Sequence, residues 1–261
     1  MNLSAQFTDE VDENIRHLRE ASDLPQKSLD WMMAVGTAGN YPYNFLWMGR
    51  PIIQYPQDMV AMQELIWSTK PDLIIEIGIA HGGSLVFSAS MLALLDLDDA
   101  IASGNTVDPK ASSRKVLGID IDIRPHNRAA IEAHPMASWI KMIEGSSIVP
   151  ETISQVEKEA KEYRRILVCL DSNHTHDHVF AELEAYSSLV TLGSYCVVFD
   201  TLIEEMPAGS FPDKPWDTGN NPRTAVEAFL EINDRFEVDY TIDAKLQISV
   251  APGGYLKCVS E

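Results

Sequence analysis

Short apolar runs alternate along the chain with longer segments in which apolar residues recur at helical spacing. The runs have the length and aliphatic content of strands buried on both faces; they are residues 73–77, 116–120, 139–143, 166–170 and 195–199. The amphipathic segments that predict helices are residues 57–69, 84–92, 127–133, 151–163, 179–189 and 222–233. This alternation is typical of a doubly wound α/β fold with a mostly parallel sheet.

Two further strands are expected near the C-terminus, at residues 236–242 and 255–259. We expect no helix between them and therefore antiparallel pairing, which completes a seven-stranded, Rossmann-like sheet with an antiparallel last strand. Residues 95–115 are polar and rich in turn formers, so they predict a long surface loop.

The first 55 residues predict a helical and aromatic extension ahead of a ligand-binding domain at residues 56–261. Apolar residues follow Thr8 at helical spacing, which indicates an amphipathic helix. Residues 36–51 are irregular and aromatic, and they either cover a ligand or anchor a loop to the core. The Pro- and Gly-rich residues 204–223 are too long for a simple connection and predict an active-site lid.

The composition argues against several classes of function. The chain has 20 Lys and Arg against 39 Asp and Glu, and its net charge of −19 repels nucleic acids and anionic membranes. No apolar run approaches the ~18 residues of a membrane span, and the acidic N-terminus lacks the apolar segment of a signal peptide. Cys169, Cys196 and Cys258 lie in apolar runs, as expected for reduced thiols in a cytoplasmic protein.

A glycine-rich turn follows the first strand of the predicted sheet. Its pattern is Glu76-x-Gly78-x-x-x-Gly82, and Ser84 opens the next helix. Glycines let a ligand approach the backbone, and ligands bind at the carboxyl ends of the strands in such sheets. The spacing is not the G-x-G-x-x-G of dinucleotide sites, and the carboxylate of Glu76 suits a cationic ligand such as S-adenosylmethionine. The alternative is a plain turn between strand and helix.

Polar residues also follow the second and third strands. Asp120 ends the second strand, where an acidic side chain can accept hydrogen bonds from ribose hydroxyls, and Asp122 follows closely. Ser146 follows the third strand, where a polar group can contact an adenine. Without the glycine turn, the two aspartates would be interpreted as solvated turn residues.

The fourth and fifth strands each end in an aspartate, Asp171 and Asp200. Because the carboxyl ends of parallel strands meet at one edge of the sheet, we expect these carboxylates to converge on the same crevice. A pair of carboxylates with room for water is what Mg²⁺ prefers. Each aspartate alone would equally suit a cap for the turn that follows it.

Three histidines, His174, His176 and His178, follow Asp171. They lack a nearby cysteine and the H-E-x-x-H pattern, so a zinc site is disfavoured. A histidine titrates near the working pH and suits a general base. His174 lies nearest the strand end and is the candidate; the other two are expected in solvent or at the mouth of the site.

The motifs EIGIAHGGS, GIDIDIRPHN, CLDSNHTH and VVFD, in this order, resemble those of class I S-adenosylmethionine-dependent methyltransferases. More narrowly, the chain is similar from about Tyr43 to Val259 to the cephalosporin hydroxylase family, which includes rhamnosyl O-methyltransferases. The resemblance implies O-methylation of a hydroxyl group of a small molecule or sugar, with S-adenosylmethionine and Mg²⁺ as cofactors. It also implies a homo-oligomer.

The resemblance implies roles for single residues. Glu76, Gly78 and Gly82 would hold the methionine part of the cofactor, and Asp120 would take the ribose hydroxyls. Catalysis would rest on a metal ion bound by Asp171 and Asp200 and on His174 as the base; both metal ligands follow their strands directly.

One position departs from the resemblance. Relatives carry two acidic residues at the end of the fifth strand, whereas this chain has Phe199 and Asp200, followed by Thr201. One metal ligand is therefore missing, or is replaced by Thr201 or water. This departure keeps another interpretation open: a family member that binds the cofactor in a hydroxylase-associated or non-catalytic role, or an assembly module.

Two oxidoreductase readings are disfavoured. A nicotinamide dehydrogenase would need the dinucleotide glycine spacing. An iron oxygenase could use His174, His176 and Asp177, but the glycine turn would then have no role.

Overall fold

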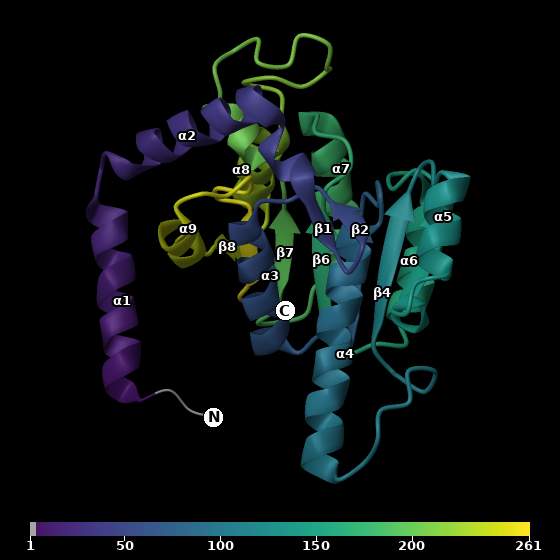
Figure 1. Ribbon diagram of the computed structural model, residues 1–261. Helices are drawn as coiled ribbons and strands as arrows, with labels where there is room; N and C mark the ends of the chain where they lie inside the picture. The colour runs from purple at the N-terminus through teal and green to yellow at the C-terminus, as the bar shows by residue number, and fades with distance from the viewer. Residues whose placement is uncertain (1–3) are drawn as a thin grey trace.

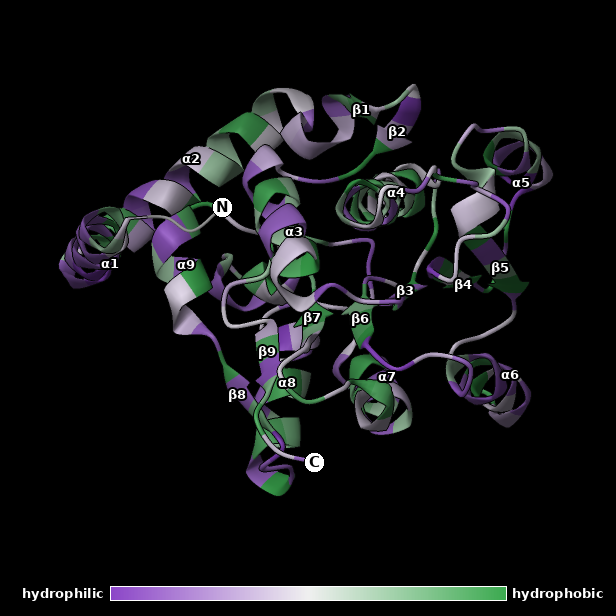
Figure 2. Cartoon of the chain, turned by 90° about the horizontal axis from the view of Figure 1, so that it is seen from below, coloured by the Kyte–Doolittle hydropathy of each residue, from purple (hydrophilic) through white to green (hydrophobic). Residues whose placement is uncertain are grey.

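The computed structural model describes residues 4–261 and has a single large sheet covered by helices on both faces (Figures 1 and 2). Its strands lie in the order β5-β4-β3-β6-β7-β9-β8. They are β3 (Leu73–Ile77), β4 (Lys115–Asp120), β5 (Ile140–Glu144), β6 (Ile166–Leu170), β7 (Tyr195–Val198), β8 (Phe236–Val238) and β9 (Tyr255–Cys258). The first five are parallel, and β9 runs antiparallel to both of its neighbours. The predicted fold class is confirmed.

Helices pack on the sheet in two layers (Figure 2). One face carries α3 (Pro56–Thr69), α4 (Gly83–Ser103) and α5 (Pro125–Glu132). The opposite face carries α6 (Pro150–Ala160), α7 (His176–Tyr186) and α8 (Pro222–Ile232). Strand side chains alternate between the two cores: Ile74 packs with the first layer, whereas Leu73 and Ile75 pack with the second.

The helix α4 corrects one expectation. Residues 95–115 were expected to form a loop, yet the helix continues to Ser103 and ends at Gly104, whose φ is +70°. The acidic residues in this part hide the helical pattern, because Leu95 is buried and Asp96 accepts from both Arg114 and Trp139. Paired charges here support a helix that the composition alone does not suggest.

The C-terminal part corrects a second expectation. The strand expected at residues 236–242 ends at Val238, and a short helix, α9 (Tyr240–Leu246), follows it. Asp239 caps this helix by accepting from the backbone N–H of Thr241. A helix therefore separates β8 from β9, although their predicted antiparallel pairing is confirmed.

The N-terminal residues form two helices and a small hairpin. Helix α1 (Ala5–Glu20) begins at the cap Ser4 rather than at Thr8, and none of its residues is buried. Helix α2 (Leu24–Gly39) was not foreseen and takes up the first part of the segment expected to be irregular. After a 3₁₀ turn (Tyr41–Asn44), the strands β1 (Phe45–Trp47) and β2 (Arg50–Ile52) form the hairpin.

In Figure 1, α1 lies away from the sheet, and α2 runs from the end of α1 toward the carboxyl ends of the strands. The proposed boundary after residue 55 stays a prediction. Among residues 4–261, no helix is long and apolar enough to cross a membrane.

Candidate functional site

The glycine turn after β3 brings two strand ends together. Gly78 has a φ of +99°, and a Cβ atom there would collide with the carbonyl oxygen of Asp171 after β6. Gly83, at the start of α4, lies equally close to the carbonyl oxygen of Pro51 in the N-terminal hairpin. Glycine is therefore required at both positions, and the turn is packed between β6 and the hairpin.

Side chains from three elements hold the peptide groups of this turn. Asp120, at the end of β4, accepts hydrogen bonds from the backbone N–H groups of Ile79 (2.9 Å) and Ala80 (3.3 Å). Asn127 of α5 donates to the carbonyl oxygen of Ala80, and Arg50 of β2 donates to that of His81. Arg50 and Asn127 were not foreseen. Asn127 ends the GIDIDIRPHN motif, but nothing in the local sequence shows that either side chain reaches this turn.

The other residues expected to contact the adenosine do not line the large cleft that is described below. Asp122 is exposed and its backbone N–H donates to Asp120. Ser146 is half-buried in the turn after β5. Neither of them, nor the side chain of Asp120, is among the described residues that line the main cleft.

Glu76 is buried at the carboxyl end of β3, next to the start of α4. Its Oε2 accepts a hydrogen bond of 3.3 Å from the hydroxyl of Ser88, and its Oε1 has no partner among the described residues. Burial raises the pKa of this carboxyl to about 7. Ser84, one helical turn before Ser88 in α4, lines the large cleft that is described below.

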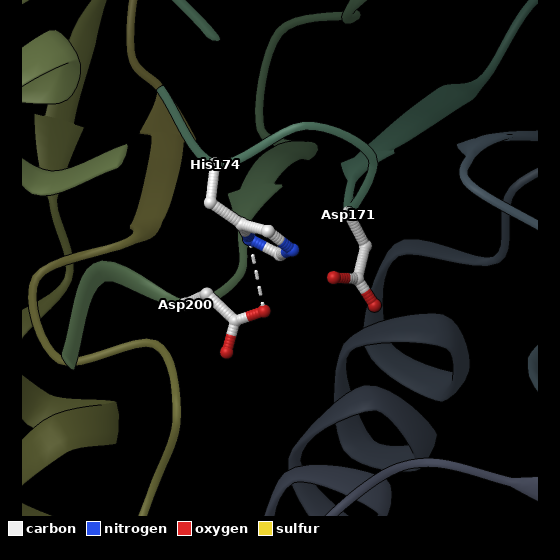
Figure 3. A group of neighbouring side chains, drawn as sticks. All are labelled: Asp171, His174 and Asp200. Carbon is white, nitrogen blue, oxygen red and sulfur yellow. Dashed lines mark ion pairs between the residues drawn. The ribbon is translucent and has the colours of Figure 1, made fainter. Parts of the chain in front are cut away.

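Three side chains converge at the ends of β6 and β7, as Figure 3 shows. Candidate ligand atoms of Asp171, His174 and Asp200 all lie within 4.8 Å of one another. His174 Nδ1 is 3.1 Å from Asp200 Oδ2. Burial and then the negative charge of Asp200 raise the pKa of the Asp171 carboxyl well above its usual range. Two carboxylates that repel each other in this way suit a divalent cation.

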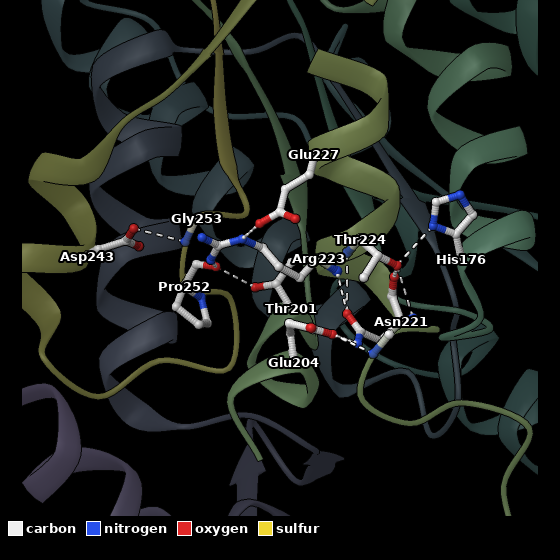
Figure 4. Close-up of polar contacts among 11 residues, drawn as sticks. His176, Thr201, Glu204, Asn221, Arg223, Thr224, Glu227, Asp243, Pro252 and Gly253 are labelled. Carbon is white, nitrogen blue, oxygen red and sulfur yellow. Dashed lines mark hydrogen bonds and ion pairs between the residues drawn. The ribbon is translucent and has the colours of Figure 1, made fainter. Parts of the chain in front are cut away.

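The other candidate residues of this region do not join the group. Thr201 is fully buried and its hydroxyl donates to the carbonyl oxygen of Pro252 (2.8 Å), which also accepts from Arg223 (Figure 4). The hydroxyl of Thr224 lies 2.9 Å from His176, and Glu182 lies 3.1 Å from His178. Of the three histidines, only His174 reaches the carboxylates.

A cleft of about 860 Å³ opens over these groups. Its floor includes Gly78, Ser84, Asp171, His174 and Asp200. One wall comes from α2, through residues such as Met32 and Met33, and the opposite wall from the segment that follows β7. The contribution of α2 was missed, although Pro25 after the cap Asp23 is a helix-start signal.

The lid was predicted at residues 204–223; both ends of that range are helical, and the irregular part, residues 206–220, lines the cleft with Met206, Phe211 and Trp216. The ring of Trp216 lies edge-on to that of His174, with 4.6 Å between centroids. Glu204 holds the two ends of this segment together, because it accepts from the Gly219 N–H (2.8 Å) and from the Asn221 side chain (Figure 4).

Comparisons with protein-family models and with curated proteins point to the same family. The family described as "Rhamnosyl O-methyltransferase/CmcI" matches residues 39–259. Rhamnosyl O-methyltransferases are similar over most of their length: that of Mycobacterium leprae is 29% identical over 84% of this chain and 85% of its own. That of Mycobacterium tuberculosis (strain H37Rv) is 30% identical over 83% and 81%.

Solved structures with the same fold include apo CmcI-N160, with a TM-score of 0.56 and 20% identity over 84% of this chain and 78% of that chain. CmcI-D160 with Mg and SAM has a TM-score of 0.54 and 17% identity over the same shares of the chains. An O-methyltransferase from Bacillus cereus in complex with SAH has a TM-score of 0.51 and 16% identity over 81% and 82%. At these identities the likeness supports the fold alone.

Proposed function

The chain belongs to the rhamnosyl O-methyltransferase/CmcI family and is an S-adenosylmethionine-dependent O-methyltransferase, and we propose that it methylates a hydroxyl group of a sugar or other small molecule with the help of Mg²⁺. The observation that carries the proposal is the convergence of Asp171, His174 and Asp200 beside the glycine turn in one cleft.

The proposed cofactor seat is the glycine turn and its surroundings. Glu76, Gly78, Gly82 and Ser84 would hold the methionine part, because Glu76 offers a buried carboxylate oxygen without a donor. Asp120 would take a ribose hydroxyl in addition to the three backbone N–H groups from which it already accepts, since a carboxylate can accept about four hydrogen bonds.

Asp122 and Ser146 remain the proposed contacts of the adenosine side. Asp122 follows β4, the neighbour of the strand that carries the glycine turn, and Ser146 follows β5, the next strand of the sheet. Exchange of either side chain should weaken cofactor binding if the proposal is right.

The proposed metal ligands are the carboxylates of Asp171 and Asp200. Bound Mg²⁺ would act as a Lewis acid that lowers the pKa of the acceptor hydroxyl. Thr201 was the third candidate ligand, but its hydroxyl is engaged with Pro252. Water is therefore favoured over Thr201 as the metal ligand that replaces the acidic side chain absent at position 199.

His174 is the proposed general base. If Nδ1 carries the proton and donates to Asp200, Nε2 is free to accept the proton of the acceptor hydroxyl. The deprotonated oxygen then bonds to the methyl carbon while the carbon–sulfur bond breaks and its electron pair returns to sulfur. The sulfonium charge disappears in this step, so the residues of the site contribute mainly through alignment and exclusion of water.

Phe199 is buried in the core at the position where the resemblance predicts an acidic residue. The proposed metal site therefore lacks one carboxylate, which should weaken Mg²⁺ binding and lower turnover. Turnover with a panel of sugar and phenolic acceptors at rising Mg²⁺ concentrations tests this.

Calorimetry with S-adenosylhomocysteine tests the proposed site. We expect one molecule bound per chain, and a separate Mg²⁺ binding event that the Asp171→Asn exchange abolishes. No binding of S-adenosylhomocysteine would refute the proposed cofactor seat, and Mg²⁺ binding that survives the exchange would refute the metal site.

We further infer a homo-oligomer and a cytoplasmic location. Reduced, buried cysteines at positions 169, 196 and 258 support the location, and the family resemblance supports the oligomer. Sedimentation of the purified protein and fractionation of the source cells test the two inferences.

A further inference from the structure

A second, smaller pocket adjoins the main cleft beneath the start of α4. Its volume is about 30 Å³, enough for a water molecule or a group of similar size. Gln54, Ser84 and Asp171 line both this pocket and the main cleft, so the two spaces share a boundary. Gln54 lies between β2 and α3, in the connection that follows the N-terminal hairpin.

Two buried oxygen atoms of this pocket have no hydrogen-bond donor among residues 4–261. They are Oε1 of Gln54, whose residue is 8% exposed, and Oε1 of Glu76, whose residue is 4% exposed. Of the other two carboxylates of the pocket, Asp58 already accepts from Ser249, Val250 and Tyr255, and Asp171 belongs to the proposed metal site. Unpaired acceptors at this depth are costly, so Gln54 and Glu76 indicate a ligand that supplies donors.

The charge of the pocket favours a cationic donor over water. Among the described residues, Glu76 accepts a hydrogen bond from the hydroxyl of Ser88, and no cationic side chain lines the pocket. A carboxylate that is buried without a cation is unfavourable unless a positive group joins it. A primary ammonium group is about the size of water and carries three donors.

We propose that Gln54 accepts a hydrogen bond from the amino group of the cofactor's methionine part, beside Glu76 in the same pocket. This inference rests on the proposed cofactor seat and adds a residue from outside the sheet. The close packing of Gly83 against Pro51 explains how the connection from the hairpin reaches the pocket. Part of the cofactor site thus comes from the segment that precedes the methyltransferase domain.

The test compares two ligands by calorimetry on the full chain: S-adenosylhomocysteine and its desamino analogue, which lacks only the amino group. The Gln54→Met exchange keeps the length of the side chain and removes the oxygen. We expect it to weaken S-adenosylhomocysteine binding about tenfold or more, as a lost hydrogen bond to a charged group does. Binding of the desamino analogue should be unchanged.

Gln57 provides a matched control. Its Oε1 is also buried without a partner, but the residue lines neither pocket. Gln57→Met should leave both affinities unchanged. A Gln54→Met protein that loses affinity for both ligands equally, or for neither, would overturn the inference.

Gln54→Glu is the variant to use if the Gln54→Met protein folds poorly. It retains an acceptor and adds a negative charge, so the preference for S-adenosylhomocysteine over the desamino analogue should rise above that of the wild type. An unchanged or lower preference would contradict the inference. Failure of the wild type to bind S-adenosylhomocysteine would instead refute the proposed cofactor seat.

Discussion

His174 and Asp200 form the pair on which the proposed proton transfer depends. The two side chains come from different strand ends and meet at 3.1 Å only because β6 and β7 are neighbours. Asp200 has a φ of +58°, an unusual value for a non-glycine residue. Its carboxylate would keep the ring of His174 in the orientation and tautomer that a base requires.

His174→Ala should therefore lower the turnover number by roughly 10²–10⁴-fold, the usual contribution of an acid–base group. The affinity for S-adenosylhomocysteine should stay the same, because the glycine turn is untouched. Single-turnover kinetics and calorimetry measure the two quantities.

His176→Ala is the matched control, since His176 contacts Thr224 rather than the carboxylates. It should retain turnover within a few-fold. Equal losses in the two variants would remove His174 from the mechanism.

Among the elements, α3 is tied to the C-terminal strand by a buried carboxylate. Asp58 of α3 is fully buried and accepts from the hydroxyls of Ser249 and Tyr255 and from the Val250 N–H. Burial raises the pKa of Asp58 from 3.8 to about 6. Its ionisation therefore opposes folding.

The sign of the pH dependence follows from this shift. The contribution of neutral Asp58 to stability is fully present below about pH 4 and is lost as the pH rises through about 6. Asp58→Asn removes this loss, so from pH 4 to pH 8 the wild type should lose about 2 kcal/mol of unfolding free energy relative to the variant. Urea unfolding across this pH range measures the difference.

Asp9→Asn, at an exposed position of α1, is the control and should follow the wild-type curve at every pH. Parallel curves for the wild type and Asp58→Asn would contradict the assignment.

The segment at residues 206–220, predicted to be a lid, is the second element whose role can be tested. Glu204 joins both ends of residues 206–220 but does not line the cleft. Glu204→Ala should loosen the segment that carries Trp216 and raise the KM for the acceptor about tenfold, the effect of one or two lost hydrogen bonds. The affinity for S-adenosylhomocysteine should not change.

Steady-state kinetics with varied acceptor measure the effect, with Glu205→Ala at the exposed neighbouring position as the control. If both variants raise KM equally, Glu204 does not organise the lid.

For the whole molecule, the sheet could be predicted closely and the extension only in part. Buried strands such as β3 stand out because their runs are continuous and are bounded by Pro71 and Gly78. The alternation of strands and helices predicts parallel strands whose carboxyl ends share one edge of the sheet, so the meeting of Asp171 and Asp200 was within reach of the sequence. Helix α2 was missed because Gly36 and Gly39 lie inside it.

Long-range contacts explain what the sequence could not predict. The burial of Gln54 depends on how the hairpin packs against α4, and the engagement of Thr201 depends on Pro252, far along the chain. No local pattern specifies either contact. The fold was therefore more predictable than the details of the site.

Mg²⁺-assisted methylation of a hydroxyl group is tested most directly by following a labelled methyl group from S-adenosylmethionine to a panel of sugar and phenolic hydroxyl acceptors. It is made with the protein as purified, after treatment with a chelator, and after Mg²⁺ is restored. We expect methyl transfer to an acceptor hydroxyl that falls with the chelator, returns with Mg²⁺ and is abolished by Asp171→Asn. Cofactor that binds while no acceptor is methylated, or transfer that is indifferent to chelator and to Asp171, would refute Mg²⁺-assisted O-methylation.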